Sequence, residues 1–488
     1  MDVEIGGALT IAQLEAVANG RARPVLAAAA CARIAQGRAV VDQVVEGRIP
    51  AYGITTGVGS QKDYAVDHDT IAAYNDRLIT AHATMAPGPL ASRQGVRAAL
   101  TVQLQMFASG RPGVRQALVD ALLARLQSDD LPDARLGSSP GASDIVPMSQ
   151  LAVPIIGRQG VGPGGRGPSP LPGLAAKEAL SLLNNNSFTI GQGALAVAEA
   201  RRLLDAQTLA AALSLEGFRG NAASWSAPVD AARGQPGQRR TGAALRAALA
   251  GSDLLKPGAN RLLQDPLSFR CVPQIHGAAE SAMAFAWESW ERELSAVGDN
   301  PIIVWEDDAF VSHGNMESTL LALTLDTLRL ALAKVADASG ERIHKIQWPS
   351  FTGLPTGLVD EPGVIGGVQF LNLGHITGAC VTAIRHAATP TVLAFRGQIC
   401  DGVEDVAGGA PFAVEQTEIL LARGWVLAAI EAVCAAWAVA RRGLDPATLG
   451  AGTGPLYRAI RPLLPIGAEG ERIFDLAPAV EALKATVP

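Results

Sequence analysis

The sequence predicts a mainly α protein, with a smaller N-terminal domain over residues 1–190 and a long helical bundle over residues 191–488. Beyond residue 174 the chain is dominated by stretches rich in alanine and leucine. These stretches are apolar around more than a narrow stripe, which is typical of helices buried inside a bundle. Strand signals are weak and local, and residues 302–311 alone indicate a small hairpin.

The N-terminal part alternates short helical stretches with turns and loops. Residues 50–59 (PAYGITTGVG) interrupt the helical pattern with three glycines, two adjacent threonines and a tyrosine, which indicates a shaped loop. A second break, at residues 110–113 (GRPG), ends another helix. Helical periodicity predicts helices within residues 10–14, 26–43, 71–84, 92–108 and 114–127.

Residues 136–173 differ in character, because they are rich in glycine, proline and serine. Their first half carries interspersed apolar residues and is expected to pack, whereas residues 157–173 have the composition of a mobile surface loop. The bundle is then predicted from six helices, within residues 175–183, 194–215, 281–297, 318–339, 366–388 and 411–441.

Composition excludes several classes of function. The formal charge is −6, no Lys/Arg-rich run occurs, and 5% of residues are aromatic, so a nucleic-acid surface is not expected. Residues 1–20 lack the basic and apolar regions of a signal peptide. The five cysteines are scattered without zinc or redox spacing. We therefore expect a cytoplasmic protein with reduced thiols, no metal and no membrane partner.

Seven segments, in order along the chain, resemble motifs of histidine ammonia-lyases of the aromatic amino acid lyase family. One such match is weak evidence, but seven in order and at similar spacing identify the chain as a member. The matching segments are residues 51–59 (AYGITTGVG), 136–157, 175–184 (AAKEALSLLN), 264–274 (QDPLSFRCVPQ), 299–301 (DNP), 314–315 (GN) and 404–405 (ED).

The resemblance implies a helical fold of the ammonia-lyase/fumarase-like type and a homotetramer whose active sites combine residues of more than one subunit. It also implies a prosthetic group. Family members make the electrophile 4-methylideneimidazol-5-one (MIO) by cyclising an Ala-Ser-Gly segment with loss of two waters, because no ordinary side chain turns ammonia into a good leaving group. The resemblance further implies a small-molecule substrate, either an amino acid or a related carboxylate.

Carried over by motif, Tyr52 is the general base that takes the β-proton. A free tyrosine has a pKa near ~10, so this role requires a depressed pKa or a proton relay. The alternative is a packed loop aromatic. Arg270 is expected to pair with the substrate carboxylate, which suits guanidinium geometry, or else to bridge two helices. His82 is either a substrate contact or a structural histidine near a helix end.

The resemblance gives polar roles to four further residues. Asn184 and Gln264 are expected to hydrogen-bond the cofactor and the substrate amino group, although Asn184 also suits a helix cap. Asn315 is expected near the substrate, or is a turn residue after a glycine. Glu404 is expected to act on the substrate amine or imidazole, with a solvated charge as the alternative. The DNP segment at residues 299–301 is interpreted as a structural turn.

The cofactor-forming segment departs from the family pattern, GSxGASGDLAPL. Here residues 137–148 read GSSPGASDIVPM. Without a gap, the triad is Gly141-Ala142-Ser143, and Ala142 supplies no hydroxyl. With a shift of one residue, the triad is Ala142-Ser143-Asp144, and Asp144 replaces the glycine that permits a tightly kinked backbone. We favour the ungapped register, so no cofactor is expected unless MIO forms from Ala142-Ser143-Asp144.

Three hypotheses for function follow. The first is a histidine ammonia-lyase-like enzyme that lacks MIO and performs acid–base lyase or cyclisation chemistry on an amino acid or another carboxylate-bearing substrate. Such chemistry needs a more acidic proton or a better leaving group than ammonia. The second is a working ammonia-lyase acting on histidine or a related amino acid. The third is a non-catalytic homologue, against which the retained polar residues argue.

Overall fold

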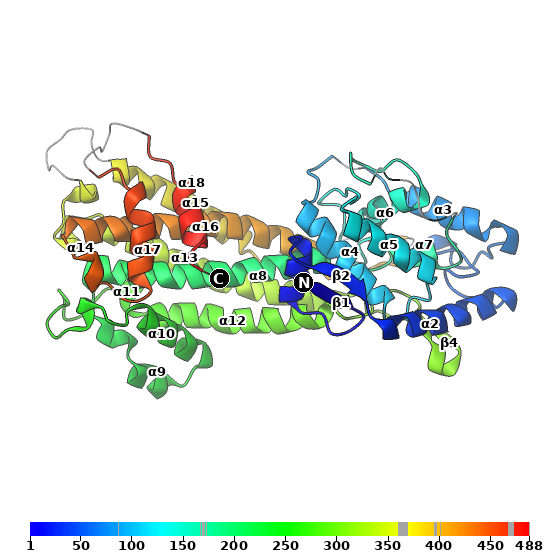
Figure 1. Ribbon diagram of the computed structural model, residues 1–488, viewed down its shortest axis with the longest axis horizontal. Coiled ribbons are helices and arrows are strands. Elements are labelled where there is room, and N and C mark those ends of the chain that lie inside the picture. The colour runs from blue at the N-terminus through cyan, green and yellow to red at the C-terminus, as the bar shows by residue number, and fades with distance from the viewer. Residues whose placement is uncertain are drawn as a thin grey trace. The chain divides into compact units, whose positions relative to one another are not determined.

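The computed structural model describes residues 1–488 except 86, 166, 168–170, 172, 360–368, 395–397, 401, 467–472 and 488. Helices dominate the chain, and the longest are α8 (Ser187–Phe218), α12 (Val272–Glu293), α13 (Thr319–Ile346) and α16 (Ala410–Arg441) (Figure 1). The predicted mainly α fold class is confirmed. Parts of two predicted segments, the loop at 157–173 and the helix at 366–388, fall on residues outside the described set.

The chain divides into two compact units. The first comprises Met1–Ala198, Trp287–Thr324 and Pro390–Glu415, and the second comprises Glu199–Ala286, Leu325–Thr389 and Gln416–Pro488. The predicted division after residue 190 lies close to the first of these boundaries. The prediction did not assign two later segments, residues 287–324 and 390–415, to the first unit. Each of the four long helices has residues in both units.

The first unit begins with a short parallel pair of strands, β1 (Asp2–Ile5) and β2 (Arg23–Leu26), which the helical periodicity of this region did not indicate. Thr10 caps the next helix through a reciprocal capping box with Gln13. The predicted hairpin is confirmed as β3 (Ile302–Val304) paired with β4 (Ala309–Val311). The helices of this unit are α1 (Ile11–Ala18), α2 (Ala28–Glu46), α3 (Ile71–His82), α4 (Arg93–Phe107), α5 (Gln116–Ser128), α6 (Ile145–Ala152) and α7 (Glu178–Leu183).

Long helices account for most of the bundle. A buried carboxylate ties three of them together in the second unit, because Glu431 accepts hydrogen bonds from Arg342, Ser339 and Ser214 at 2.5–2.9 Å. The helices from residue 187 onward are α8 (Ser187–Phe218), α9 (Ala227–Arg233), α10 (Pro236–Ala248), α11 (Leu267–Arg270), α12 (Val272–Glu293), α13 (Thr319–Ile346), α14 (Pro349–Thr352), α15 (Leu373–Ala387), α16 (Ala410–Arg441), α17 (Thr453–Ile460) and α18 (Ala477–Lys484).

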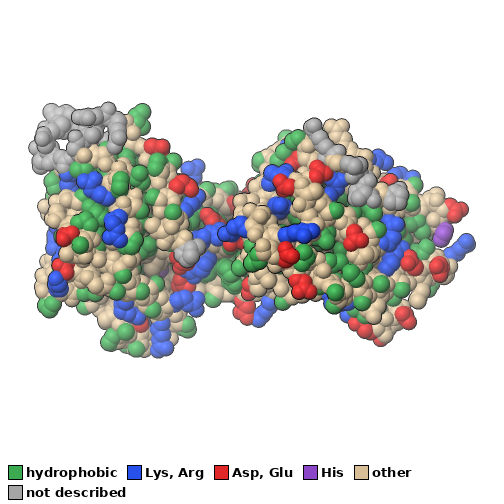
Figure 2. All heavy atoms as spheres, viewed as in Figure 1, with side chains coloured by type: hydrophobic (Ala, Val, Ile, Leu, Met, Phe, Trp, Pro, Cys, Tyr) green, Lys and Arg blue, Asp and Glu red, His purple; other side chains and the backbone are tan. Residues whose placement is uncertain are grey.

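Two features concern the expectation that the chain binds neither nucleic acid nor a membrane: the charges on its surface and the burial of α16. On the face shown in Figure 2, basic and acidic side chains are interspersed and form no continuous basic patch. Among the described helices, α16 alone is long and apolar enough to cross a membrane. However, 78% of its apolar window is buried inside the protein, as expected for the core helix of a bundle.

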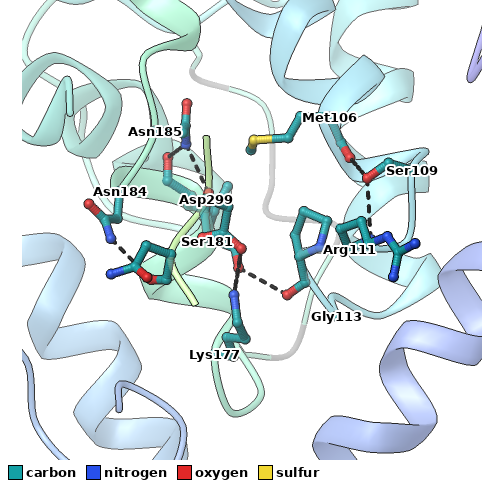
Figure 3. A network of polar contacts seen from close by, with 12 residues as sticks. Met106, Ser109, Arg111, Gly113, Lys177, Ser181, Asn184, Asn185 and Asp299 are labelled. Carbon is teal, nitrogen blue, oxygen red and sulfur yellow. Dashed lines mark hydrogen bonds and ion pairs between the residues drawn. The ribbon is translucent and has the colours of Figure 1, made fainter. Parts of the chain in front are cut away.

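A fully buried ion pair lies within the first unit. The Lys177 ammonium donates to the carboxylate of Asp299 at 2.5 Å, and the Ser181 hydroxyl donates to the same oxygen (Figure 3). Burial lowers the pKa of Lys177 and raises the pKa of Asp299, and the pairing opposes both shifts. This pair fixes the segment 299–301, in agreement with the structural interpretation of the DNP motif.

Candidate active site

Two cavities of about 280 Å³ and 370 Å³ lie within the first unit and share part of their lining. All the residues that line them come from this unit. The shared residues come from segments far apart in the sequence, so the two cavities form one composite site. These residues are Tyr52, Ala142, Ser143, Asn184 and Glu404.

The loop at residues 50–59 presents Tyr52 to this site. Gly53 has a φ of +65°, and a Cβ there would lie 2.2 Å from Leu180, so the turn requires glycine. The Tyr52 hydroxyl accepts a hydrogen bond from the amide of Gly59 at 3.1 Å. Burial and then the charge of Glu404 raise the pKa of Tyr52, which the Gly59 amide only partly offsets. The pKa of Tyr52 is therefore raised and not depressed. If Tyr52 is the general base, it needs a proton relay.

Glu404 is half-buried beside the tyrosine, and burial raises the pKa of its carboxyl. The thiol of Cys400, which also lines the larger cavity, donates a hydrogen bond to this carboxylate and lowers that pKa again. His82 contributes a smaller electrostatic stabilisation. A half-buried carboxylate with a raised pKa is a better proton acceptor than an exposed one, which is what a relay from a tyrosine needs.

His82 lies at the end of α3 and lines the larger cavity. Its Nδ1 lies 2.8 Å from the carbonyl oxygen of Leu78, one turn earlier in the helix. In the neutral ring Nδ1 therefore carries the proton, and Nε2 is the acceptor. One ring nitrogen of His82 thus contacts its own helix, and the other is suited to a ligand, so both sequence interpretations of this residue stay open.

The segment at residues 137–148 has a backbone that distinguishes the two registers. Ser143 has a φ of +62°, a left-handed conformation that serine adopts rarely and glycine readily. In the ungapped register Ser143 stands where the family motif has its glycine. Asp144 has a φ of −90°, which needs no glycine, and it occupies the N-cap position of α6. The backbone therefore favours the ungapped register.

The residues of this segment do not fit MIO in either register. Ala142 has no hydroxyl to lose. In the shifted register, the amide nitrogen of Asp144 would have to attack a carbonyl carbon, but it donates to the carbonyl oxygen of Asn185 at 2.8 Å. The Asp144 carboxylate is also fully buried and accepts hydrogen bonds from the amide and hydroxyl of Thr189 at 2.7 and 2.8 Å. Burial raises the pKa of this carboxyl, and the bonds to Thr189 lower it.

The lining of the smaller cavity includes the polar residues Asn184 and His313. Asn184 lies at the end of α7, and its amide donates to the carbonyl oxygen of Asn300 at 3.1 Å (Figure 3). His313 lines the same cavity and is held by the carbonyl of Asp299 at 2.8 Å. Asp299, which pairs with the buried Lys177, thus also contacts a residue that lines the cavity.

Three predicted substrate contacts are not brought to this site by the chain. The exposed side chain of Asn315 donates to the carbonyl oxygen of Val297 at 3.4 Å, although its neighbours Gly314 and Met316 line the smaller cavity. Gln264, which is exposed, and Arg270, which is half-buried, belong to the second unit. The Nε of Arg270 is buried and has no hydrogen-bond partner among the described residues.

Sequence reasoning missed several residues of the site. Cys400, His313 and Asn300 line the cavities, and Lys177 and Asp299 form the ion pair behind them. Lys177, Asp299 and Asn300 lie inside the motif segments 175–184 and 299–301, where they were given no role in the site. Cys400 and His313 lie within one to four residues of a motif, since Cys400 precedes Glu404 and His313 precedes the GN segment. Nothing in the sequence alone indicated that they face the same space.

Comparisons with known proteins show which family the chain resembles in sequence and structure. The model of the aromatic amino acid lyase family matches residues 9–462. A histidine ammonia-lyase of Symbiobacterium thermophilum is 33% identical over 99% of this chain and 95% of its own. A histidine ammonia-lyase of Anaeromyxobacter sp. strain K is 35% identical over 78% of each chain. The ergothioneine-degrading ergothionase of Treponema denticola, solved with desmethyl-ergothioneine sulfonic acid, is similar with a TM-score of 0.90 and 28% identity, covering 100% of this chain and 98% of that one.

Proposed function

Because the chain belongs to the aromatic amino acid lyase family and is a histidine ammonia-lyase-like enzyme, we propose that it eliminates an amine from a histidine-derived zwitterion without the MIO electrophile. The observation that carries this proposal is the left-handed Ser143, which leaves Ala142 at the position of the serine that the family dehydrates. Without the electrophile, the reaction needs a leaving group better than ammonia.

A quaternary ammonium meets this need, because the departing nitrogen takes the electron pair of the C–N bond and leaves as a neutral tertiary amine. Ergothioneine is a histidine-derived betaine of this kind, and the similar enzyme from Treponema denticola is described as degrading it. In the proposed step Tyr52 first passes its hydroxyl proton to Glu404, and the resulting tyrosinate takes the β-proton. The electrons of the C–H bond then form the Cα=Cβ double bond, and the amine departs with the electron pair of the C–N bond. Atoms and charge balance without a further reactant.

The charges of the smaller cavity support a cationic group on the substrate. Glu317, Glu404 and Asp405 line it, and none of the described residues lining either cavity is a lysine or arginine. A fixed positive charge is stabilised by such a lining. Glu404 is the group that we assign to the proton relay from Tyr52.

We also propose a homotetramer in which Arg270 and Gln264 reach the site of a neighbouring subunit. Large apolar side chains are exposed on the long helices, with Leu320 at 55%, Leu330 at 52% and Ile419 at 43% exposure, which favours burial against another copy. The buried and unpartnered Nε of Arg270 supports a missing anionic partner, such as a substrate carboxylate.

A second candidate is a working ammonia-lyase on histidine, which the names of the relatives at 33–35% identity favour. A substrate comparison separates the two functions. We expect purified protein to release trimethylamine from ergothioneine or from the trimethylbetaine of histidine, and to release no ammonia from L-histidine. Ammonia release from L-histidine with no reaction of either betaine would favour the second candidate and remove the first.

A further inference from the structure

The hydroxyl of Ser143 is a buried polar group without a partner at the centre of the site. The residue is 1% exposed and lines both cavities. Its Oγ has no hydrogen-bond partner among the described residues. A buried hydroxyl in this state costs free energy, so its retention in a residue that lines a cavity calls for an explanation such as a ligand atom that satisfies it.

The backbone around Ser143 holds this hydroxyl in place. Ser139 donates its hydroxyl to the carbonyl of Ser143 at 3.2 Å, and Asp144 donates its amide to Asn185 at 2.8 Å. Ala142 forms a bridge with Glu317 on the facing segment. The left-handed φ of Ser143 is unfavourable for any residue with a Cβ, and glycine would relieve it. Serine is thus an energetically poor choice for this backbone, which points to a role for its side chain.

The chemistry of a betaine selects the atom that this hydroxyl can bind. A quaternary nitrogen carries no lone pair to accept a proton and no N–H to donate. The strong acceptors of such a substrate are its carboxylate oxygens. No lysine or arginine is among the described residues lining the cavities, so within the chain a carboxylate depends on neutral donors. Asn184 supplies one, because only one of its two amide protons goes to Asn300.

We propose that Ser143 is a substrate-binding residue whose hydroxyl donates a hydrogen bond to the α-carboxylate of the substrate. This assignment rests on the proposed function for the class of substrate. A contact to the carboxylate is made in the ground state and kept in the transition state, so it contributes to binding and not to the chemical step. It therefore acts on KM, and kcat changes little.

The test measures equilibrium binding by calorimetry in a Tyr52→Phe background, which prevents turnover. The probes are ergothioneine and its decarboxylated counterpart. Ser143→Ala and Ser143→Gly are expected to weaken the binding of ergothioneine by roughly 10- to 100-fold. Both variants should bind the decarboxylated probe as the parent does. Ser143→Gly should also raise Tm, because it relieves the left-handed strain, so that lost binding is not a sign of lost stability.

The matched control is Ser149→Ala on α6. Its hydroxyl is also buried and lacks a partner among the described residues, but it does not line either cavity. This variant should bind both probes as the parent does. Unchanged binding of ergothioneine in Ser143→Ala, or an equal loss for both probes, would overturn the carboxylate contact.

The two proposals fail in different ways in this experiment. Binding that depends on Ser143, with no amine released by the protein carrying Tyr52, would remove the proposed reaction and keep the carboxylate contact. If the protein releases the amine, and neither turnover nor the binding of ergothioneine changes when Ser143 is replaced, the proposed reaction is kept and the carboxylate contact is removed. If the parent binds neither probe, the substrate class and the Ser143 contact are overturned together.

Discussion

Replacement of Tyr52 by phenylalanine is expected to lower kcat by about 10²- to 10⁴-fold, the usual contribution of a positioned general base. The hydroxyl is the one atom removed, and it makes a single hydrogen bond within the described structure, from the amide of Gly59. The fold should therefore persist, with Tm and the circular dichroism spectrum close to those of the parent. Ligand binding should also persist, because the phenyl ring keeps the shape of the cavity.

Tyr64→Phe is the matched control, since this tyrosine follows in the same region and is 71% exposed. It should leave kcat unchanged. The pH dependence provides a second readout. Because burial and Glu404 raise the pKa of Tyr52 above its ordinary value, kcat/KM of the parent should rise as the pH increases from neutral towards that pKa. This alkaline rise should be absent in Tyr52→Phe. Unchanged turnover in that variant would remove Tyr52 from the mechanism.

Arg270→Ala is expected to raise KM by roughly 10- to 100-fold for a carboxylate substrate, the cost of losing a charge-assisted pair. Arg270→Lys should recover only part of this loss, because an ammonium cannot form the bidentate contact. Arg292→Ala on α12, where the side chain is 75% exposed, controls for the loss of one positive charge and should leave KM unchanged. Kinetics of Arg270→Ala equal to those of the parent would refute the pairing.

Co-expression of two impaired variants tests whether Arg270 acts across subunits. Tyr52 and Arg270 belong to different units of the chain. If a neighbouring copy supplies the arginine, co-expression of Tyr52→Phe with Arg270→Ala produces some mixed tetramers in which one site carries both native residues. Such tetramers should regain activity that neither variant has alone. A mixture no more active than the separate variants, in protein shown to be tetrameric, would contradict the shared site.

The fold was largely predictable because its signals are local. The helix predicted within residues 10–14 and the hairpin predicted at residues 302–311 each depend on residues that are close together in the sequence, and the structure reproduces both. The β1–β2 pair was missed, because two four-residue strands separated by a helix carry too little periodicity to be recognised. The return of segments 287–324 and 390–415 to the first unit depends on contacts between distant parts of the chain.

The sequence could indicate those residues of the site that belong to a family motif. It could not indicate properties that depend on how these residues are packed. The resemblance placed Tyr52, Asn184 and Glu404 together, and the structure brings them into the same cavities. It could not indicate that burial and Glu404 raise the pKa of Tyr52, because that shift depends on the packed surroundings. Likewise, the hydroxyl of Ser143 has no partner among the described residues because of the backbone angle and the burial of this residue, and the motif indicates neither of them.

The mass of the peptide spanning residues 136–148, taken from the purified protein, tests most directly whether the enzyme works without the MIO electrophile. We expect the unmodified mass, because Ala142 has no hydroxyl to lose and the amide of Asp144 is held by Asn185. A mass lower by two water molecules would show that the segment cyclises after all. In that case an electrophile of the family type is present, and elimination without it is contradicted.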